Sequence, residues 1–110
     1  MWTLTHKGTY VRQYGSPEYR VYNMVGEDDG ILFELILQEL GKVGKNGYEI
    51  CLKDSYLEYD LDRRIVSRIK KFPKDIIQFY LNEIENGYIF SKTIMNMLKK
   101  RNLIENCILY

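Results

Sequence analysis

Few residues of this chain have the type and spacing that catalysis requires. His6 is the only histidine among the 110 residues, and it lies close to the N-terminus. The sequence Gly15-Ser16-Pro17 lacks the G-x-S-x-G pattern of a nucleophile elbow. No segment follows a glycine-rich phosphate-binding pattern either. We therefore expect a protein that is not an enzyme.

Two groups of residues raise the question of a metal site or a redox site. Four carboxylates fall within 54–62, namely Asp54, Glu58, Asp60 and Asp62. Their spacing does not fit an EF-hand loop, because the central Gly and the final Glu are missing at the required offsets. Cys51 and Cys107 form no C-x-x-C pair, and each lies in an apolar run, which favours reduced and buried thiols. We expect a solvated acidic patch, no metal and no cofactor.

A strongly basic segment follows this acidic patch. Residues 63–74, RRIVSRIKKFPK, carry six positive charges and no acid, although the formal net charge of the chain is only +1. Such a segment can bind phosphate or an acidic protein surface. Apolar spacing predicts a basic amphipathic helix over 58–72 that buries Leu61, Ile65, Ile69 and Phe72. Its candidate phosphate contacts, one helical turn apart, are Arg64, Arg68 and Lys71. The alternative is a solvated helix face.

A second basic segment lies near the C-terminus. The stretch 91–105, SKTIMNMLKKRNLIE, resembles the recognition helix of winged-helix DNA-binding domains: a serine starts the helix, apolar residues anchor it, and a basic end precedes Leu-Ile. The matching residues are Ser91, Lys92, Thr93, Ile94, Leu98, Lys99, Lys100, Leu103 and Ile104. The resemblance implies DNA binding, with Lys92, Lys99 and Lys100 as the candidate contacts. The connection 86–90 is longer than a tight helix-turn-helix turn, and an ordinary core helix is the alternative.

The N-terminal part of the chain suggests a protein-binding surface. Residues 9–14 and 18–25 are rich in Tyr and Val and flank Gly15-Ser16-Pro17, which predicts a β-hairpin. Alternation would place three side chains on one face of each strand. These candidates are Tyr10, Arg12 and Tyr14 on the first strand, and Arg20, Tyr22 and Met24 on the second. Tyr, Arg and Met are enriched at protein interfaces, whereas the alternative is a half-buried sheet whose tyrosines cover the core.

The remaining pattern completes an α+β prediction. Seven of the ten residues in ILFELILQEL are apolar, so the helix expected over 30–42 has more apolar surface than one small core covers, which favours a homo-oligomer such as a homodimer. Further helices are expected over 74–85 and 91–101, with an edge strand over 1–5. The predicted fold is one α+β domain over 1–110 with three to four helices. Its small, mostly antiparallel sheet combines the N-terminal hairpin with strands near 48–53 and 103–109.

Composition narrows the class of function. The chain has no alanine and is rich in Ile, Lys, Tyr and Asn, residues with AT-rich codons, which suggests a phage or a mobile element. No apolar run is long enough to span a bilayer, and no secretory signal is visible, so we expect a cytoplasmic protein without a membrane partner. The preferred prediction is a non-catalytic inhibitor that binds another protein, of the anti-defence or toxin-immunity type. The alternative is a small DNA-binding regulator that uses helix 58–72 or helix 91–101.

Overall fold

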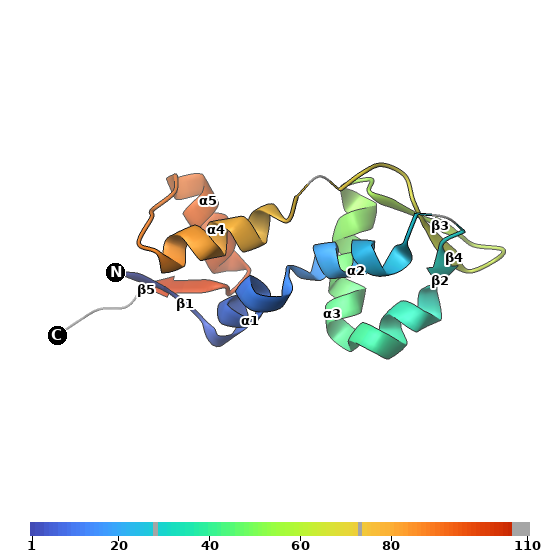
Figure 1. Cartoon of the computed structure of the whole chain (residues 1–110), viewed down its shortest axis with the longest axis horizontal. Coiled ribbons are helices and arrows are strands. Elements are labelled where there is room, and N and C mark those ends of the chain that lie inside the picture. The colour runs from blue at the N-terminus through green and yellow to red at the C-terminus, as the bar shows by residue number, and fades with distance from the viewer. Residues whose placement is uncertain (28, 73, 107–110) are drawn as a thin grey trace. The chain divides into compact units, whose positions relative to one another are not determined.

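The computed structural model describes residues 1–27, 29–72 and 74–106, and within them the chain is α+β, as predicted (Figure 1). The described part contains five helices and two antiparallel sheets. In chain order the elements are β1 (Trp2–Leu4), α1 (His6–Tyr14), α2 (Pro17–Val25), β2 (Ile31–Leu32), α3 (Phe33–Lys53), β3 (Leu57–Asp60), β4 (Ile65–Arg68), α4 (Ile76–Glu85), α5 (Lys92–Lys100) and β5 (Ile104–Asn106). None of the described helices is both long and apolar enough to cross a membrane.

The chain divides into two compact units, each with its own sheet and its own apolar core. The first unit joins Met1–Gly15 to Asp75–Tyr110, and the second is Ser16–Lys74. No observation tests the expectation of a single domain, which stays a prediction.

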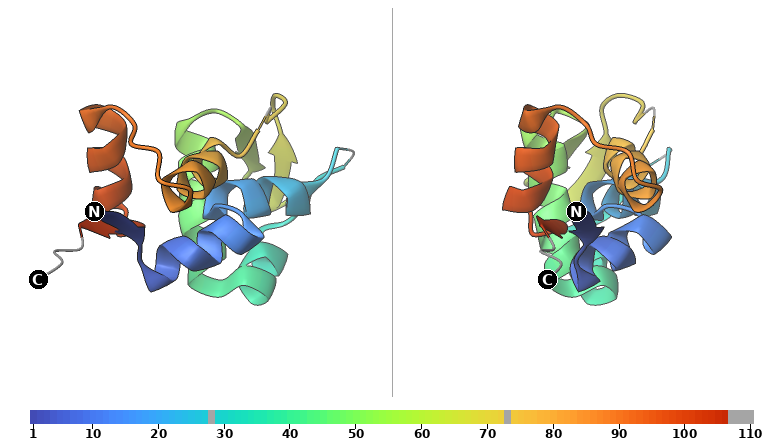
Figure 2. Two further views of the ribbon diagram at one scale, coloured as in Figure 1. Left: turned by 60° about the vertical axis from the view of Figure 1, so that its left-hand side comes forward. Right: turned by 90° about the vertical axis from the view of Figure 1, so that its left-hand side faces the viewer.

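In the first unit, strands from the two ends of the chain pair with each other. Strand β1 runs antiparallel to β5, with Trp2 opposite Asn106 and Leu4 opposite Ile104 (Figure 2). Three helices surround this pair, and each begins at a side chain that accepts a backbone N–H. The three caps are Thr5 for α1, Asp75 for α4 and Ser91 for α5. The buried core residues are Val11, Ile77, Leu81, Ile84, Met95, Leu98, Leu103 and Ile104.

In the second unit, α2 and α3 pack with a three-stranded sheet of order β2–β4–β3. Both neighbouring pairs are antiparallel. Helix α3 is interrupted at Gly41, whose φ of 57° and ψ of −132° are not helical. The buried residues of this core are Val21, Tyr22, Val25, Ile36, Tyr48, Cys51, Leu57 and Val66.

The predicted N-terminal hairpin is wrong, because residues 9–14 and 18–25 lie in α1 and α2. The segment Ser16-Pro17 begins a helix instead of turning a hairpin: Ser16 Oγ accepts from Tyr19 N at 3.3 Å, and Pro17 occupies the first turn. The buried residues of this segment follow helical spacing: they are Val21, Tyr22 and Val25. The β preference of Tyr and Val is therefore overridden by packing.

The predicted strand at 48–53 is also wrong, because these residues form the last turns of α3. The pair Asn46-Gly47 is typical of a turn before a strand. Gly47 is instead inside the helix, where a β-carbon would stand 2.2 Å from Pro17 O. The glycine lets α3 approach the start of α2 closely, so it marks helix packing and not a turn.

The predicted helix over 58–72 is a β-hairpin, formed by β3 and β4. Asp60 starts the turn, since its carboxylate accepts from the backbone N–H groups of Asp62 and Arg63 at 3.1 and 3.2 Å. Leu61, predicted to be buried, is 79% exposed at the tip of the hairpin. The predictions for α4, α5, the edge strand β1 and the start of the last strand are confirmed. Residues 107–109 of that predicted strand lie outside the described residues.

Candidate nucleic-acid interface

Helix α5 is held in place along one side. Ser91 Oγ accepts from Ile94 N at 3.4 Å at its start. Beyond its end, Leu103 N donates to Leu98 O at 3.0 Å as the chain turns into β5. Met95 and Leu98 are buried in the core of the first unit. The cap and this apolar anchor fix which side of α5 faces outward.

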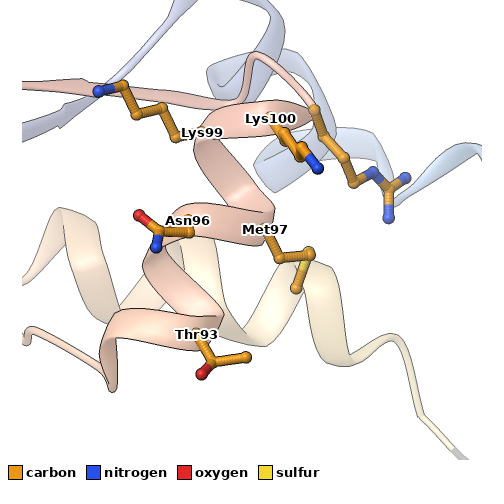
Figure 3. A pocket seen from close by; sticks show the side chains of 6 residues that line it. Thr93, Asn96, Met97, Lys99 and Lys100 are labelled. Carbon is orange, nitrogen blue, oxygen red and sulfur yellow. The ribbon is translucent and has the colours of Figure 1, made fainter.

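The outward side of α5 carries two adjoining rows of side chains. One row is Lys92, Asn96 and Lys99, and the other is Thr93, Met97 and Lys100; each has the i, i+4, i+7 spacing of one helix face. All of these side chains are exposed except that of Met97, which is partly buried. Figure 3 shows Asn96 and Lys99 on the left flank of this outward side and Met97 and Lys100 on its right flank.

A hollow of about 900 Å³ lies over this face. Its lining residues are Thr93, Asn96, Met97, Lys99, Lys100 and Arg101 (Figure 3). Lys7 adds positive charge at the same end of α5, because its Nζ donates to Arg101 O at 3.3 Å. The hollow therefore combines an apolar patch at Met97 with a basic rim.

The positive charge of α5 is not neutralised within the described residues. No acid occurs between residues 91 and 104. None of the ion pairs between described residues involves Lys92, Lys99 or Lys100. Exposed lysines on a helix are suited to contact phosphate oxygens, and Asn96 offers an amide that can pair with adenine.

The second predicted basic stripe, Arg64, Arg68 and Lys71, does not exist as a helix face. Arg64 lies in the turn after β3 and pairs with Glu34 at 3.5 Å. Arg68 ends β4, and Lys71 lies beyond it, outside any helix. The i, i+4, i+7 spacing has no meaning here, because successive residues of a strand point to opposite sides.

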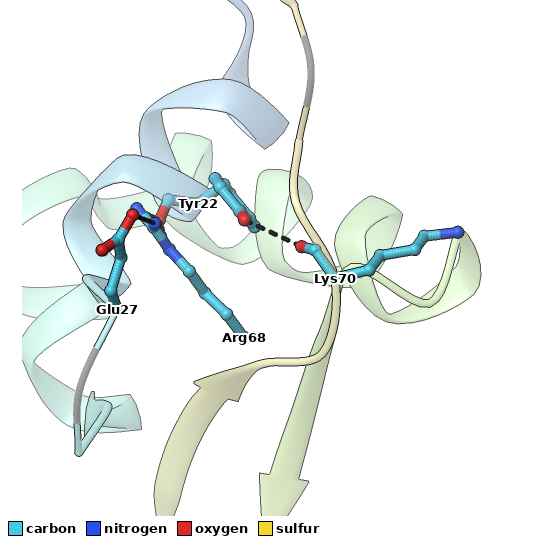
Figure 4. Close-up of polar contacts among 4 residues, drawn as sticks. All are labelled: Tyr22, Glu27, Arg68 and Lys70. Carbon is cyan, nitrogen blue, oxygen red and sulfur yellow. Dashed lines mark hydrogen bonds and ion pairs between the residues drawn. The ribbon is translucent and has the colours of Figure 1, made fainter.

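Arg68 is occupied by the second unit itself (Figure 4). Its Nε and one terminal nitrogen donate to Tyr22 O at 3.3 and 3.1 Å, and its other terminal nitrogen lies 3.7 Å from Glu27 Oε1. Only 18% of the side chain is exposed. Arg68 therefore joins β4 to α2 and is poorly placed to contact a ligand.

The six candidate protein-binding residues do not share a hairpin face. Tyr10, Arg12 and Tyr14 belong to α1 in the first unit, and the other three belong to α2 in the second. Tyr22 is buried, and its hydroxyl donates to Lys70 O at 2.8 Å. Arg20 and Met24 are partly buried and line an open groove on the second unit. Tyr10 and Tyr14 are about half exposed, with ring centroids 4.7 Å apart.

Of the cysteine and carboxylate candidates, the structure describes Cys51, Asp54, Glu58, Asp60 and Asp62. Within the described residues, no three His, Cys, Asp or Glu side chains are grouped so that they could hold a metal ion. Cys51 is buried, its Sγ donates to Glu18 O at 3.3 Å, and burial raises the pKa of the thiol to about 12. Cys107 lies outside the described residues.

A comparison with models of known protein families finds no match for this chain. The sequence interpretation found the lysines of α5, because a serine cap and apolar spacing marked the helix. It missed residues 42–53 as a helix with an exposed polar face, because Asn46-Gly47 is typical of a turn. The available signal was the spacing of Gly44 and Gly47 beside Tyr48 and Cys51.

Proposed function

We propose that this protein is a small, non-catalytic DNA-binding regulator that acts in the cytoplasm and holds duplex DNA against the exposed face of α5. The observation that carries the proposal is the placement of Lys92, Lys99 and Lys100 on one exposed surface with Asn96, with no carboxylate paired to them among the described residues. This is the alternative prediction of the sequence, and it is preferred because the hairpin behind the protein-binding prediction is absent.

The charge distribution supports the choice of α5. The first unit has six basic and four acidic residues, and one of those acids, Asp75, is buried at the start of α4. The second unit has ten basic and eleven acidic residues. The positive potential that attracts phosphate is therefore concentrated on the unit that carries α5.

The expected mechanism is electrostatic binding with limited base contact. The three ammonium groups displace counterions from phosphates, which supplies most of the affinity and makes it dependent on salt. With α5 in the major groove, Asn96 and Thr93 meet base edges, while the lysines fix the helix on the backbone.

Fluorescence anisotropy with a labelled duplex at several salt concentrations tests this proposal. Replacing Lys92, Lys99 and Lys100 together with Gln is expected to lower affinity and to flatten the log–log salt slope by about 2–3 units, because each phosphate contact contributes about 0.9. The matched control replaces three exposed lysines of the other unit with Gln, namely Lys70, Lys71 and Lys74. This control is expected to keep the salt slope of the wild type. Equal slopes for the wild type and the α5 variant would exclude α5 as the contact.

A second candidate is the non-catalytic inhibitor of another protein, of the anti-defence or toxin-immunity type. The specific observation is the exposed pair Tyr10 and Tyr14 on α1, since exposed aromatic residues are typical interface anchors. A pull-down with nuclease treatment tests it: a protein partner retained after nuclease, lost on Tyr10→Ala with Tyr14→Ala and kept by the exposed control Tyr88→Ala would support this candidate. A partner lost on nuclease treatment would favour DNA binding.

A further inference from the structure

A bend at Gly41 divides α3 into two helices. At Gly41, φ is 57° and ψ is −132°, a conformation that side chains with a β-carbon rarely adopt. Residues 33–40 lie before the bend and residues 42–53 after it, and Figure 1 shows the change of direction. Two helices joined by a short turn that contains glycine form a helix-turn-helix arrangement.

The helix after the bend has one buried face and one exposed polar face. Gly44, Gly47, Tyr48 and Cys51 are buried in the second unit. On the opposite face, all exposed, are Lys42, Lys45, Asn46, Glu49 and Lys53. These positions follow helical spacing over three turns. The buried face fixes the helix, and the exposed face holds both charged groups and groups that can pair with bases.

The surrounding elements follow the order of a winged-helix domain. Helix α2 is followed by strand β2, the two helices of α3 and the hairpin β3–β4, with sheet order β2–β4–β3. The tip of the hairpin exposes Leu61 next to Arg63 and Arg64. An apolar side chain beside two guanidinium groups suits a DNA groove. The helix after the bend is thus supported by α2, by the helix before the bend and by the three-stranded sheet.

We infer that helix 42–53 is a second DNA-contacting element, which enters the major groove and provides sequence preference. Lys42, Lys45 and Lys53 contact phosphates. Asn46 pairs with adenine and Glu49 accepts from the amino group of cytosine, the pairings that these side chains favour in the major groove. The inference shares the class of ligand with the proposed function, but it rests on different residues in a different unit.

The test begins with selection of duplexes from a random-sequence library by the full-length wild-type protein. Affinities for the selected duplex and for a random duplex are then measured by anisotropy at about 150 mM salt. Asn46→Ala is expected to weaken binding to the selected duplex by about 5- to 150-fold, the loss of one paired base contact. Its affinity for the random duplex is expected to change less than twofold. Asn23→Ala, an exposed asparagine on α2, is the control and should match the wild type on both duplexes. Circular dichroism confirms folding of each variant.

The outcomes separate this inference from the α5 proposal. If no sequence is enriched, or if Asn46→Ala binds the selected duplex as the wild type does, the inference is overturned. If the triple Gln variant of α5 binds both duplexes normally while Asn46→Ala loses the preference, the inference stands and the α5 proposal fails. If the α5 variant loses affinity for both duplexes alike and Asn46→Ala loses only the preference, both stand.

Discussion

The guanidinium carbon of Arg68 lies 4.1 Å from the centroid of the Tyr22 ring, while the same side chain donates to the Tyr22 carbonyl oxygen (Figure 4). The Tyr22 hydroxyl in turn donates to Lys70 O, just after β4. One tyrosine thus joins α2 to the end of β4 through its ring, its hydroxyl and its backbone. Both residues were candidates for binding a partner, and the structure gives each of them a role in stability.

Replacing Arg68 with Met is expected to lower the free energy of unfolding by about 2–3 kcal/mol. The change removes the charged hydrogen bonds to Tyr22 O and the cation–π contact from a site that is mostly buried. The control is Arg64→Met. The Arg64 side chain is 71% exposed, and its ion pair with Glu34 contributes less than about 1 kcal/mol to the free energy of unfolding. Urea denaturation monitored by circular dichroism measures the free energy of unfolding of both variants. Equal losses would show that the Arg68 contacts contribute little.

Replacing Gly41 with Ala is expected to destabilise the second unit by about 1–3 kcal/mol. A β-carbon at this position would meet no atom within 4 Å, so the cost is conformational and not steric. Lys42→Ala, one residue later and exposed, is the control and should change stability by less than about 0.5 kcal/mol. Thermal unfolding provides the comparison. A stabilised Gly41→Ala protein would mean that the bend relaxes into a continuous helix, and it would remove the helix-turn-helix arrangement.

The Cys51 thiol is expected to resist modification in the folded protein. Burial, the largest cause, and the carboxylates of Glu18 and Asp54 raise its pKa from 9.0 to about 12. Since the folded state favours the neutral thiol, its contribution to stability is complete below pH 9 and is lost as the pH rises from 9 toward 12. Reaction with a thiol reagent at pH 8 in a Cys107→Ser background, with and without guanidinium chloride, measures this. Rapid labelling without denaturant would contradict burial.

The predicted homodimer is tested through the first helix of α3. Leu35 and Leu37 are 42% and 37% exposed, which leaves apolar surface on this helix, as the sequence suggested. Light scattering at micromolar concentration should give about 26 kDa, twice the mass of the 13.2 kDa chain. Leu35→Glu should give a monomer, whereas Leu61→Glu, at the exposed hairpin tip, should leave the dimer intact. A wild-type mass of about 13 kDa would contradict the prediction.

The sequence was sufficient where local signals and packing agree. Ser91 before the apolar spacing of Ile94, Met97 and Leu98 predicted α5, and the structure has that helix with Ser91 as its cap. The buried methionine is Met95, however, whereas Met97 is only partly buried. The lysines of α5 could be placed on its outer face for the same reason, because the buried face of a helix determines the exposed one. The α+β class was predicted correctly, although only the strands near the two ends of the described chain, β1 and β5, lie where they were expected.

Tertiary structure alone decided the segments in which local preference and packing disagree. The tyrosines and valines of 9–25 prefer strands, but Ser16, Pro17 and the burial of Val21 and Val25 in one core make them helical. Asn46-Gly47 is typical of a turn, yet Gly47 lies inside α3, and a glycine is needed there because α2 approaches too closely for a side chain. Arg68 looked like part of a basic stripe until the fold brought Tyr22 to it, 46 residues earlier in the chain. Contacts between residues so far apart in the chain leave no periodic trace in the sequence, so only the folded chain could assign these roles.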